Sequence, residues 1–278
     1  MNDKITFSFG ENWRDYLSNI SETEIESAMK DICSQLEIPT SDADAPLAGK
    51  SVIDIGSGSG IHSLSFHRLG VEALTSVDVD PHSVTATESM WERAGKPDNW
   101  KVVHGSILDN KFVGDLNTYD IVYSWGVLHH TGSMWEAIDN AMKLVKPGGQ
   151  IWIALYAKGP RYAKDLALKK KYNAATDAGK RWMVRKWILQ DMFRCAKRFK
   201  NPFVWYSKSR RGMNKYHDLI DWLGGLPYEV ANPDEVTKFA LARGFVMEGI
   251  QVANQGGCSD FIMRSVPGIQ KSVRCKAA

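Results

Sequence analysis

The chain has 278 residues, of which 44% are hydrophobic and 24% charged, and it carries a formal net charge of +3. It can therefore bury a full core in one α/β domain with insertions, or in a domain plus a cap. No apolar run reaches the roughly 18 residues of a membrane span, and residues 1–4 lead into polar sequence rather than a signal peptide.

No C-x-x-C pair is present, so neither a disulfide framework nor a zinc site is indicated, and we expect a reducing cytoplasm. The cysteines are Cys33, Cys195, Cys258 and Cys275.

The charge is distributed unevenly along the chain. Residues 158–217 contain 18 Lys and Arg against 3 acids, whereas the rest contains 17 basic and 29 acidic residues. This basic segment also holds aromatic residues such as Trp182 and Trp187, so we do not expect a flexible tail. Most of these lysines and arginines can form a solvated helix face, with the aromatic residues as a small hydrophobic core. The local excess of positive charge also indicates an anionic neighbour. This neighbour can be an acidic small molecule or glycan, a nucleic acid, or an acidic surface of the same chain or of a partner subunit.

Near the N-terminus, the aromatic run of residues 7–16 precedes a helix that Ser21 and Glu24 would open as a capping box. Residues 51–55 then read as an apolar strand that enters a loop with glycines at alternating positions, Gly56, Gly58 and Gly60. Glycine tolerates positive φ and has no Cβ, so this backbone can approach a ligand closely. A helix over residues 61–69 is predicted to open behind the loop.

A second strand over residues 73–77 ends at Asp78, which follows Gly56 by 22 residues. This is near the spacing at which an acid binds the ribose diol of a nucleotide. Asp80 is a second candidate, because the strand can end at either acid. The loop spacing G-x-G-x-G differs from the G-x-G-x-x-G of dinucleotide sites, and Asp54 in the strand would repel phosphates. A nucleoside ligand without a pyrophosphate is indicated.

Three further segments follow in order. They are a strand with Val102 and Val103 before residues 104–109, a strand and its continuation over residues 119–130, and the run Lys143–Ala154, which contains a Lys-Pro-Gly-Gly turn. With the glycine loop and Asp78, these segments resemble the class I S-adenosylmethionine-dependent methyltransferases over roughly residues 50–157.

The resemblance implies a set of roles for individual residues. The glycine loop would pack against the amino-acid part of S-adenosylmethionine, with Asp54 orienting the loop or the ammonium, and Asp78 or Asp80 would bind the ribose. Ser106 stands where many relatives have an aspartate near the adenine, and the backbone of Ile107 can serve instead. The floor of the site would be Ser124, Trp125 and Gly126, with Trp125 equally able to be a core residue. The implied cofactor residues are Asp54, Gly56, Ser57, Gly58, Gly60, Asp78, Asp80, Ser106, Ile107, Ser124, Trp125 and Gly126.

The same resemblance implies an α/β fold with a Rossmann-like, seven-stranded, mostly parallel sheet and helices on both faces. We expect an N-terminal helical lid over residues 1–46, a cofactor-binding core over 47–157, a basic helical substrate cap over 158–228, and completion of the core by 229–278. The aromatic residues of 7–16 would cover the pocket as part of this lid, or equally pack under the sheet. Apolar residues from 183 to 195 recur at spacings of three and four, which predicts a helix in the cap. Residues 211–228, rich in polar and aromatic residues with turn glycines, are interpreted as a substrate-facing loop. A helix over residues 233–243 and strands over 245–250 and 260–264 are predicted to end the fold.

Methyl transfer requires the nucleophile to be aligned and deprotonated. Histidine suits this task because its unperturbed pKa is about 6.5. The candidate bases are His129, His217, His130 and Tyr156, with His129 and His217 preferred; His129 and His130 can equally serve in packing or in orienting the cofactor.

The sequence has no Asn-Pro-Pro-Tyr or Asp-Pro-Pro-Tyr motif after the fourth strand, which argues against methylation of the exocyclic amines of adenine or cytosine in nucleic acid. It has no Pro-Cys nucleophile for methylation of cytosine C5. It also lacks the acid constellation of magnesium-dependent catechol methyltransferases. We therefore expect metal-independent methylation of an oxygen or nitrogen of a small-molecule metabolite or glycan, acidic in character. The alternatives are an RNA methyltransferase that grips nucleic acid with its basic insertion, and a non-catalytic cofactor-binding subunit.

Overall fold

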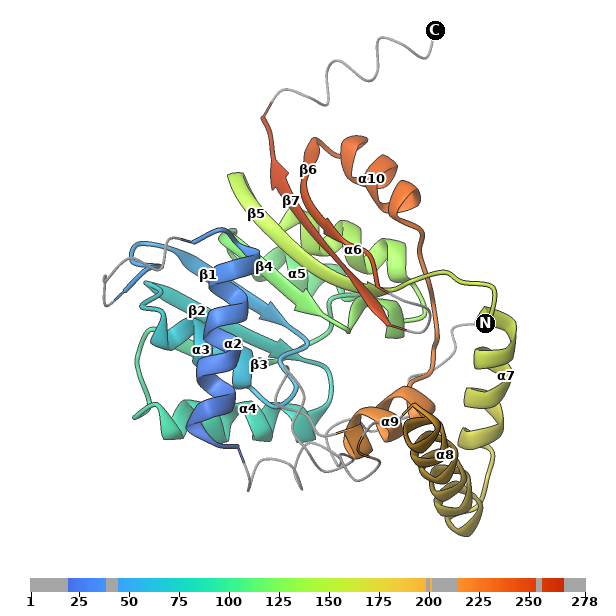
Figure 1. Ribbon diagram of the computed structural model, residues 1–278. Coiled ribbons are helices and arrows are strands. Elements are labelled where there is room, and N and C mark those ends of the chain that lie inside the picture. Colours follow the sequence, from blue (N-terminus) through green and yellow to red (C-terminus); the bar gives the residue numbers. More distant parts are fainter. Residues whose placement is uncertain (1–19, 39–44, 199–200, 202–214, 254–256, 268–278) are drawn as a thin grey trace, which may run out of the picture.

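Figure 1 shows the computed structural model of the chain, which describes residues 20–38, 45–198, 201, 215–253 and 257–267. A seven-stranded sheet has the order β3-β2-β1-β4-β5-β7-β6. Neighbouring strands from β3 to β5 pair in parallel, whereas β7 runs antiparallel to both β5 and β6. This confirms the predicted Rossmann-like sheet. The strands are β1 (Ser51–Ile55), β2 (Ala73–Asp78), β3 (Trp100–His104), β4 (Tyr119–Trp125), β5 (Val145–Tyr156), β6 (Phe245–Gln251) and β7 (Cys258–Ser265).

Helices cover both faces of this sheet (Figure 1). Alternate strand residues point to opposite faces, so Val52 belongs to one buried cluster and Ile53 to the other. One face packs against α2 (Glu22–Gln35), α3 (Ile61–Arg68) and α4 (Pro81–Arg93). The other packs against α5 (Asn110–Asp115), α6 (Met134–Lys143) and α10 (Pro233–Leu241). A short 3-10 turn, η1 (Leu128–His130), follows β4.

The strand order reverses between β1 and β4, since β1 continues to β2 on one side while β4 leads to β5 on the other. In open α/β sheets, the crevice at such a reversal, beyond the carboxyl ends of the strands, is the usual ligand site. The glycine loop after β1 and the histidines after β4 both lie at this edge. The fold therefore places the predicted cofactor and base residues at one end of the sheet.

In the described part of the chain, three helices lie between β5 and α10 and form the cap: α7 (Tyr162–Asn173), α8 (Asp177–Lys197) and α9 (Lys215–Gly224). They share a separate hydrophobic cluster that includes Tyr172, Met183 and Leu223. The predicted helical insertion is confirmed, but the interpretation of residues 211–228 as a loop is wrong from Lys215 to Gly224. Leu219 and Leu223 lie one helical turn apart and are buried in this cluster, which stabilises α9 as a helix. The turn-forming Gly224 and Gly225 mark its end.

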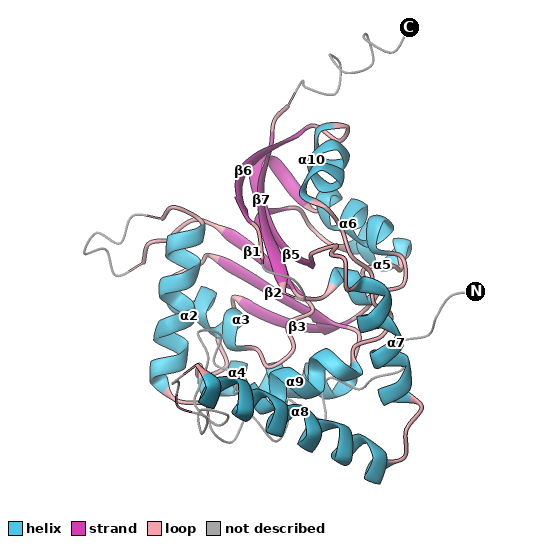
Figure 2. Cartoon of the chain, turned by 45° about the vertical axis from the view of Figure 1, so that its right-hand side comes forward, coloured by secondary structure: helices cyan, strands magenta, loops and turns pink. Residues whose placement is uncertain are grey.

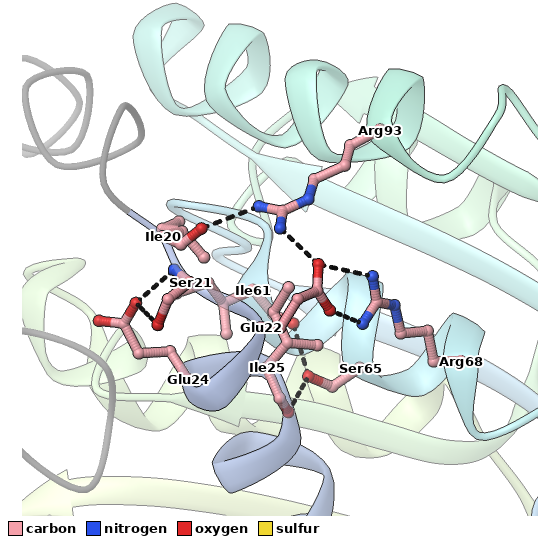
Figure 3. A network of polar contacts seen from close by, with 9 residues as sticks. All are labelled: Ile20, Ser21, Glu22, Glu24, Ile25, Ile61, Ser65, Arg68 and Arg93. Atoms are coloured by element: carbon pink, nitrogen blue, oxygen red, sulfur yellow. Dashed lines mark hydrogen bonds and ion pairs between the residues drawn. The ribbon is translucent and has the colours of Figure 1, made fainter.

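The first described helix, α2, begins at the predicted capping box, in which Glu24 accepts hydrogen bonds from the Ser21 amide and hydroxyl. Glu22 binds Arg68 of α3 and Arg93 of α4 (Figure 3). The hydrogen bonds from Arg68 and then Arg93 lower the pKa of Glu22 to about 2. These contacts tie α2 to α3 and α4. The aromatic run of residues 7–16, expected to cover the pocket, lies outside the described residues.

Candidate active site

The backbone of the glycine loop has positive φ angles, which residues with a Cβ rarely adopt. Gly56, Gly58 and Gly60 have φ values of 77°, 54° and 76°, in the left-handed region that favours glycine. A Cβ on Gly56 would lie 2.4 Å from a methyl group of Val127. The amides of Gly56 and Ser57 donate to the Val77 carbonyl, at 2.7 and 3.1 Å. Backbone hydrogen bonds to β2 thus hold the loop.

Asp78 ends β2 and is tied to the same loop. Its carboxylate accepts hydrogen bonds from the amide of Gly58 at 3.0 Å and from that of Asp80 at 2.9 Å. A carboxylate has about four acceptor positions, so Asp78 retains capacity for a ligand diol. Asp80 instead caps α4 by accepting from the His82 amide at 3.0 Å. The geometry therefore favours Asp78 over Asp80 as the ribose ligand.

Asp54 is buried on the α3 side of β1. Its carboxylate accepts a 2.5 Å hydrogen bond from Ser63, whose hydroxyl accepts from Ser76, which in turn accepts from the Trp100 indole. Burial raises the pKa of Asp54 to about 7, against the opposing effect of the Ser63 hydrogen bond. Asp54 thus joins α3 to β2 and β3 through a buried polar chain, a role that the sequence did not indicate.

The residues after β3 are engaged in local turns. The Ser106 hydroxyl accepts from the Leu108 amide at 3.2 Å. The Ile107 carbonyl accepts from the Asn140 side chain of α6 at 2.8 Å. These bonds brace the segment predicted to frame the adenine against α6.

The three residues predicted to form the floor of the site have different surroundings. Ser124 is buried and donates to the Ile55 carbonyl at 2.9 Å, which links β4 to β1. The Trp125 indole donates to Asp260 of β7 at 2.7 Å. Gly126 has a φ of 76°, and a Cβ there would meet no atom within 4 Å. Of the three, Gly126 is the residue with free space in front of it.

His129 and His130 are both buried and neutral. Burial, followed by the nearby His130 and Lys169, holds the pKa of His129 well below its usual value; the Ala154 carbonyl opposes this. Within the described residues, neither ring nitrogen of His129 reaches hydrogen-bond geometry with a partner. His130 Nδ1 lies 2.7 Å from the Pro227 carbonyl, which assigns the proton to Nδ1, and burial lowers its pKa to about 3.

A buried lysine of the cap completes this cluster. The Lys169 side chain on α7 is fully buried, and its Nζ donates to the Trp222 carbonyl of α9. The Nζ lies 5.4, 4.8 and 4.6 Å from the ring centres of Tyr156, Trp222 and Tyr228. Burial lowers the pKa of Lys169 to about 7, opposed by Asp165, Cys258 and Asp221. Burial thus makes the neutral amine more accessible than in an exposed lysine.

Tyr156 connects this lysine to the histidines. Its ring centre lies 4.2 Å from that of His129 and 5.5 Å from that of His130. The cluster therefore brings together three of the four predicted bases, His129, His130 and Tyr156. The fourth, His217, belongs to α9, but its side chain is outside the described part of the chain.

Lys169 was missed at the level of sequence because it was counted with the basic surface. A signal existed in the spacing of Tyr162, Asp165, Lys169 and Tyr172, which places these residues on one helical face. All but the half-buried Tyr162 are buried. A lysine in the middle of a buried stripe is a candidate for a perturbed amine.

Residues 53–153 match the sequence model of a family described as "Methyltransferase domain". A tRNA U34 carboxymethyltransferase of Methylococcus capsulatus is 24% identical over 65% of this chain and 56% of its own length. A ribosomal protein L11 methyltransferase of Photobacterium profundum is 30% identical over 39% of this chain and 34% of its own. The chain thus spans between about a third and just over half of these relatives.

Among solved structures, magnesium protoporphyrin IX methyltransferase from Synechocystis PCC 6803 with bound SAH has a TM-score of 0.53 at 12% identity. The match covers 91% of this chain and 93% of that one. Its likeness supports the fold. The family match identifies residues 53–153 as a methyltransferase domain, and the fold is that of the class I S-adenosylmethionine-dependent methyltransferases.

The residues at this edge fit the cofactor of that class. Three glycines with positive φ leave backbone without Cβ atoms, Asp78 offers unused acceptor positions beside them, and Gly126 borders open space. A diol and an amino acid carboxylate or ammonium are the groups that such a set of donors and acceptors recognises. S-adenosylmethionine is accordingly the cofactor of this domain.

Proposed function

We propose that the whole chain is an enzyme that methylates an oxygen, or a nitrogen, of an anionic small-molecule metabolite or glycan without a metal ion. The observation that carries this proposal is the cluster of Lys169, Tyr156, His129 and His130 at the edge of the sheet that also bears the glycine loop. The cap closes this cluster from water, as a group-transfer site requires.

When bound, the cofactor supplies an electrophilic methyl group. The chain must then orient the acceptor and take up its proton. Lys169 suits the second task, because its pKa of about 7 makes the neutral amine available at physiological pH. The lowered pKa values of His129 and His130 make both imidazoles weaker proton acceptors.

Access to Lys169 requires movement of the cap. Its amine is fully buried and is held by the Trp222 carbonyl, so an acceptor would have to replace that contact. In the protonated form, Lys169 would attract an anionic acceptor, and the excess of basic residues over 158–217 favours the same class of ligand.

The experiment that tests this proposal is mass spectrometry of cell extract incubated with the protein and methyl-labelled S-adenosylmethionine. The extract is separated into small molecules, glycans, RNA and protein. We expect labelled product among the anionic small molecules or glycans, formed equally well with a metal chelator present. Label only in RNA or protein would contradict the proposal.

RNA methylation is a second candidate. The basic insertion and the similarity to a tRNA U34 carboxymethyltransferase favour it. It requires RNA affinity that falls steeply with salt, because phosphate contacts release counterions. A third possibility is a non-catalytic cofactor-binding subunit. Observation of a single turnover with any native acceptor would exclude it.

A further inference from the structure

The outward face of α8 exposes large apolar side chains. Trp182, Leu189 and Phe193 are 61%, 66% and 63% exposed. Their spacings of seven and four residues place them along one side of the helix. Only four other large hydrophobic residues of the described chain are exposed, three of them by less than half, and no other described element carries three. The four are Val79, Leu241, Ile250 and Val252.

The opposite face of α8 is already packed. Met183 and Val184 are buried in the cap, with Trp187 and Ile188 partly buried beside them. Figure 2 shows α9 between α8 and the sheet, so that α8 forms the outer edge of the cap. The cap therefore does not need Trp182, Leu189 and Phe193 for its own core.

Basic side chains accompany the exposed apolar ones. The Lys186 ammonium lies 5.1 Å from the Trp182 ring centre, and that of Lys197 lies 4.7 Å from the Phe193 ring centre. Arg185 is exposed on the same side. The acids of α8 lie elsewhere, since Asp177 is its first residue and the half-buried Asp191 faces the cap. The outward face is thus apolar along its centre and cationic at its margins.

We propose that this face of α8 binds the surface of an anionic lipid bilayer, with the helix axis parallel to the membrane plane. Trp182, Leu189 and Phe193 would enter the interface, while Lys186 and Lys197 meet lipid phosphates. A basic helix with an apolar stripe binds membranes in this way, through apolar burial and attraction to anionic lipids. None of the helices in the described ranges is long and apolar enough to cross a bilayer.

Two other occupants fit this face less well. A second copy that pairs through its own α8 would bring an equally cationic helix against it, and like charges oppose such pairing. The acidic remainder of a second copy would satisfy the charge of the margins but would not match the apolar centre. A nucleic acid would be attracted by the lysines, but the exposed centre includes Leu189, which cannot stack on a base as an aromatic ring does. An anionic bilayer satisfies both the charge and the apolar stripe.

Flotation of the full-length protein with vesicles tests this proposal. Vesicles of phosphatidylcholine alone are compared with vesicles that also contain phosphatidylglycerol, and we expect binding to the anionic vesicles only. The variant W182A/L189A/F193A should lose about tenfold or more in vesicle affinity, because three interfacial side chains are shortened. The variant K186E/K197E should lose affinity and much of its salt dependence.

The matched control is I250A/V252A, which removes exposed apolar side chains at the edge strand β6. It should bind vesicles like the wild type, and circular dichroism should show that all variants remain folded. Equal binding to neutral and anionic vesicles, no vesicle binding, or equal losses in the control and the α8 variants would overturn the proposal. RNA binding that the α8 variants lose, without vesicle binding, would assign this face to nucleic acid.

Discussion

The two sides of the candidate active site are constructed differently. On the cofactor side, backbone groups hold one another: the amides of Gly56 and Ser57 bind the Val77 carbonyl, and Asp78 binds the amide of Gly58. On the acceptor side, side chains from distant elements meet, with Tyr156 from β5 and Lys169 from α7. A backbone-built site tolerates few substitutions, whereas a side-chain cluster can be changed one group at a time.

This difference separates the expected effects of substitutions. Changes in the glycine loop or at Asp78 should alter cofactor affinity and stability. Changes in the cap should leave cofactor affinity intact and alter turnover or the pH dependence of stability.

The largest effect is expected for Gly56→Ala. Its Cβ would lie 2.4 Å from Val127, and its φ of 77° disfavours any side chain. We expect a loss of about 3 kcal/mol or more in the free energy of unfolding, through overpacking and backbone strain. Denaturant unfolding measures it. The control Gly148→Ala, with a φ of 79° and no atom within 4 Å of its Cβ, should lose only about 1 kcal/mol. Equal losses would show that the contact with Val127 does not constrain the loop.

Asp78→Ala should weaken S-adenosylmethionine binding about 10- to 100-fold, because it removes a charged acceptor and frees the Gly58 amide. Calorimetric titration measures the dissociation constant. Asp80→Ala is the matched control, since it removes the cap of α4 and should cost about 1 kcal/mol of stability with little change in affinity. A larger loss of affinity in Asp80→Ala would exchange the roles of the two acids.

Lys169→Met should change how stability depends on pH. Burial lowers the pKa of Lys169 from 10.5 to about 7, so between these values the unfolded chain binds a proton that the folded chain lacks. This contribution raises the wild-type free energy of unfolding as pH increases. The variant lacks this contribution. Its free energy of unfolding minus that of the wild type should therefore fall by about 1 kcal/mol per pH unit from about pH 7 to 9. Denaturant unfolding at each pH measures both values.

The control for this experiment is Lys170→Met, which removes the exposed neighbour on the same helix. The difference in the free energy of unfolding between this variant and the wild type should stay constant across this pH range. A constant difference for Lys169→Met as well would mean that the buried amine keeps an ordinary affinity for protons. Lys169 would then no longer be a candidate proton acceptor.

The smallest effect on cofactor binding is expected for Gly225→Ala, on the acceptor side. A Cβ at Gly225 would lie 2.6 Å from Cε1 of His130 and 3.0 Å from the Asp221 carbonyl. The substitution should displace His130 and lower turnover, once the acceptor is known, while the dissociation constant of the cofactor stays within about twofold of the wild type. A parallel loss of cofactor affinity would show that the two sides are not independent.

The cofactor side was largely predictable from the sequence. Its loop, strand ends and Asp78 follow one another within about 30 residues, so local spacing alone places them together. The acceptor side was predictable only in part. His129, His130 and Tyr156 were candidates from their places after β4 and at the end of β5. Lys169 and Trp222 meet only through the packing of α7 and α9. Asp54 shows a further limit, since its partners Ser63 and Ser76 become apparent only once α3 lies on the sheet.

The most direct test of the account is calorimetric titration of the wild type with S-adenosylhomocysteine and, separately, with a nicotinamide dinucleotide. We expect micromolar binding of the first, retained in Lys169→Met, and no heat from the second. Clear binding of the dinucleotide, with none of S-adenosylhomocysteine, would contradict the assignment of the glycine loop and Asp78 to S-adenosylmethionine.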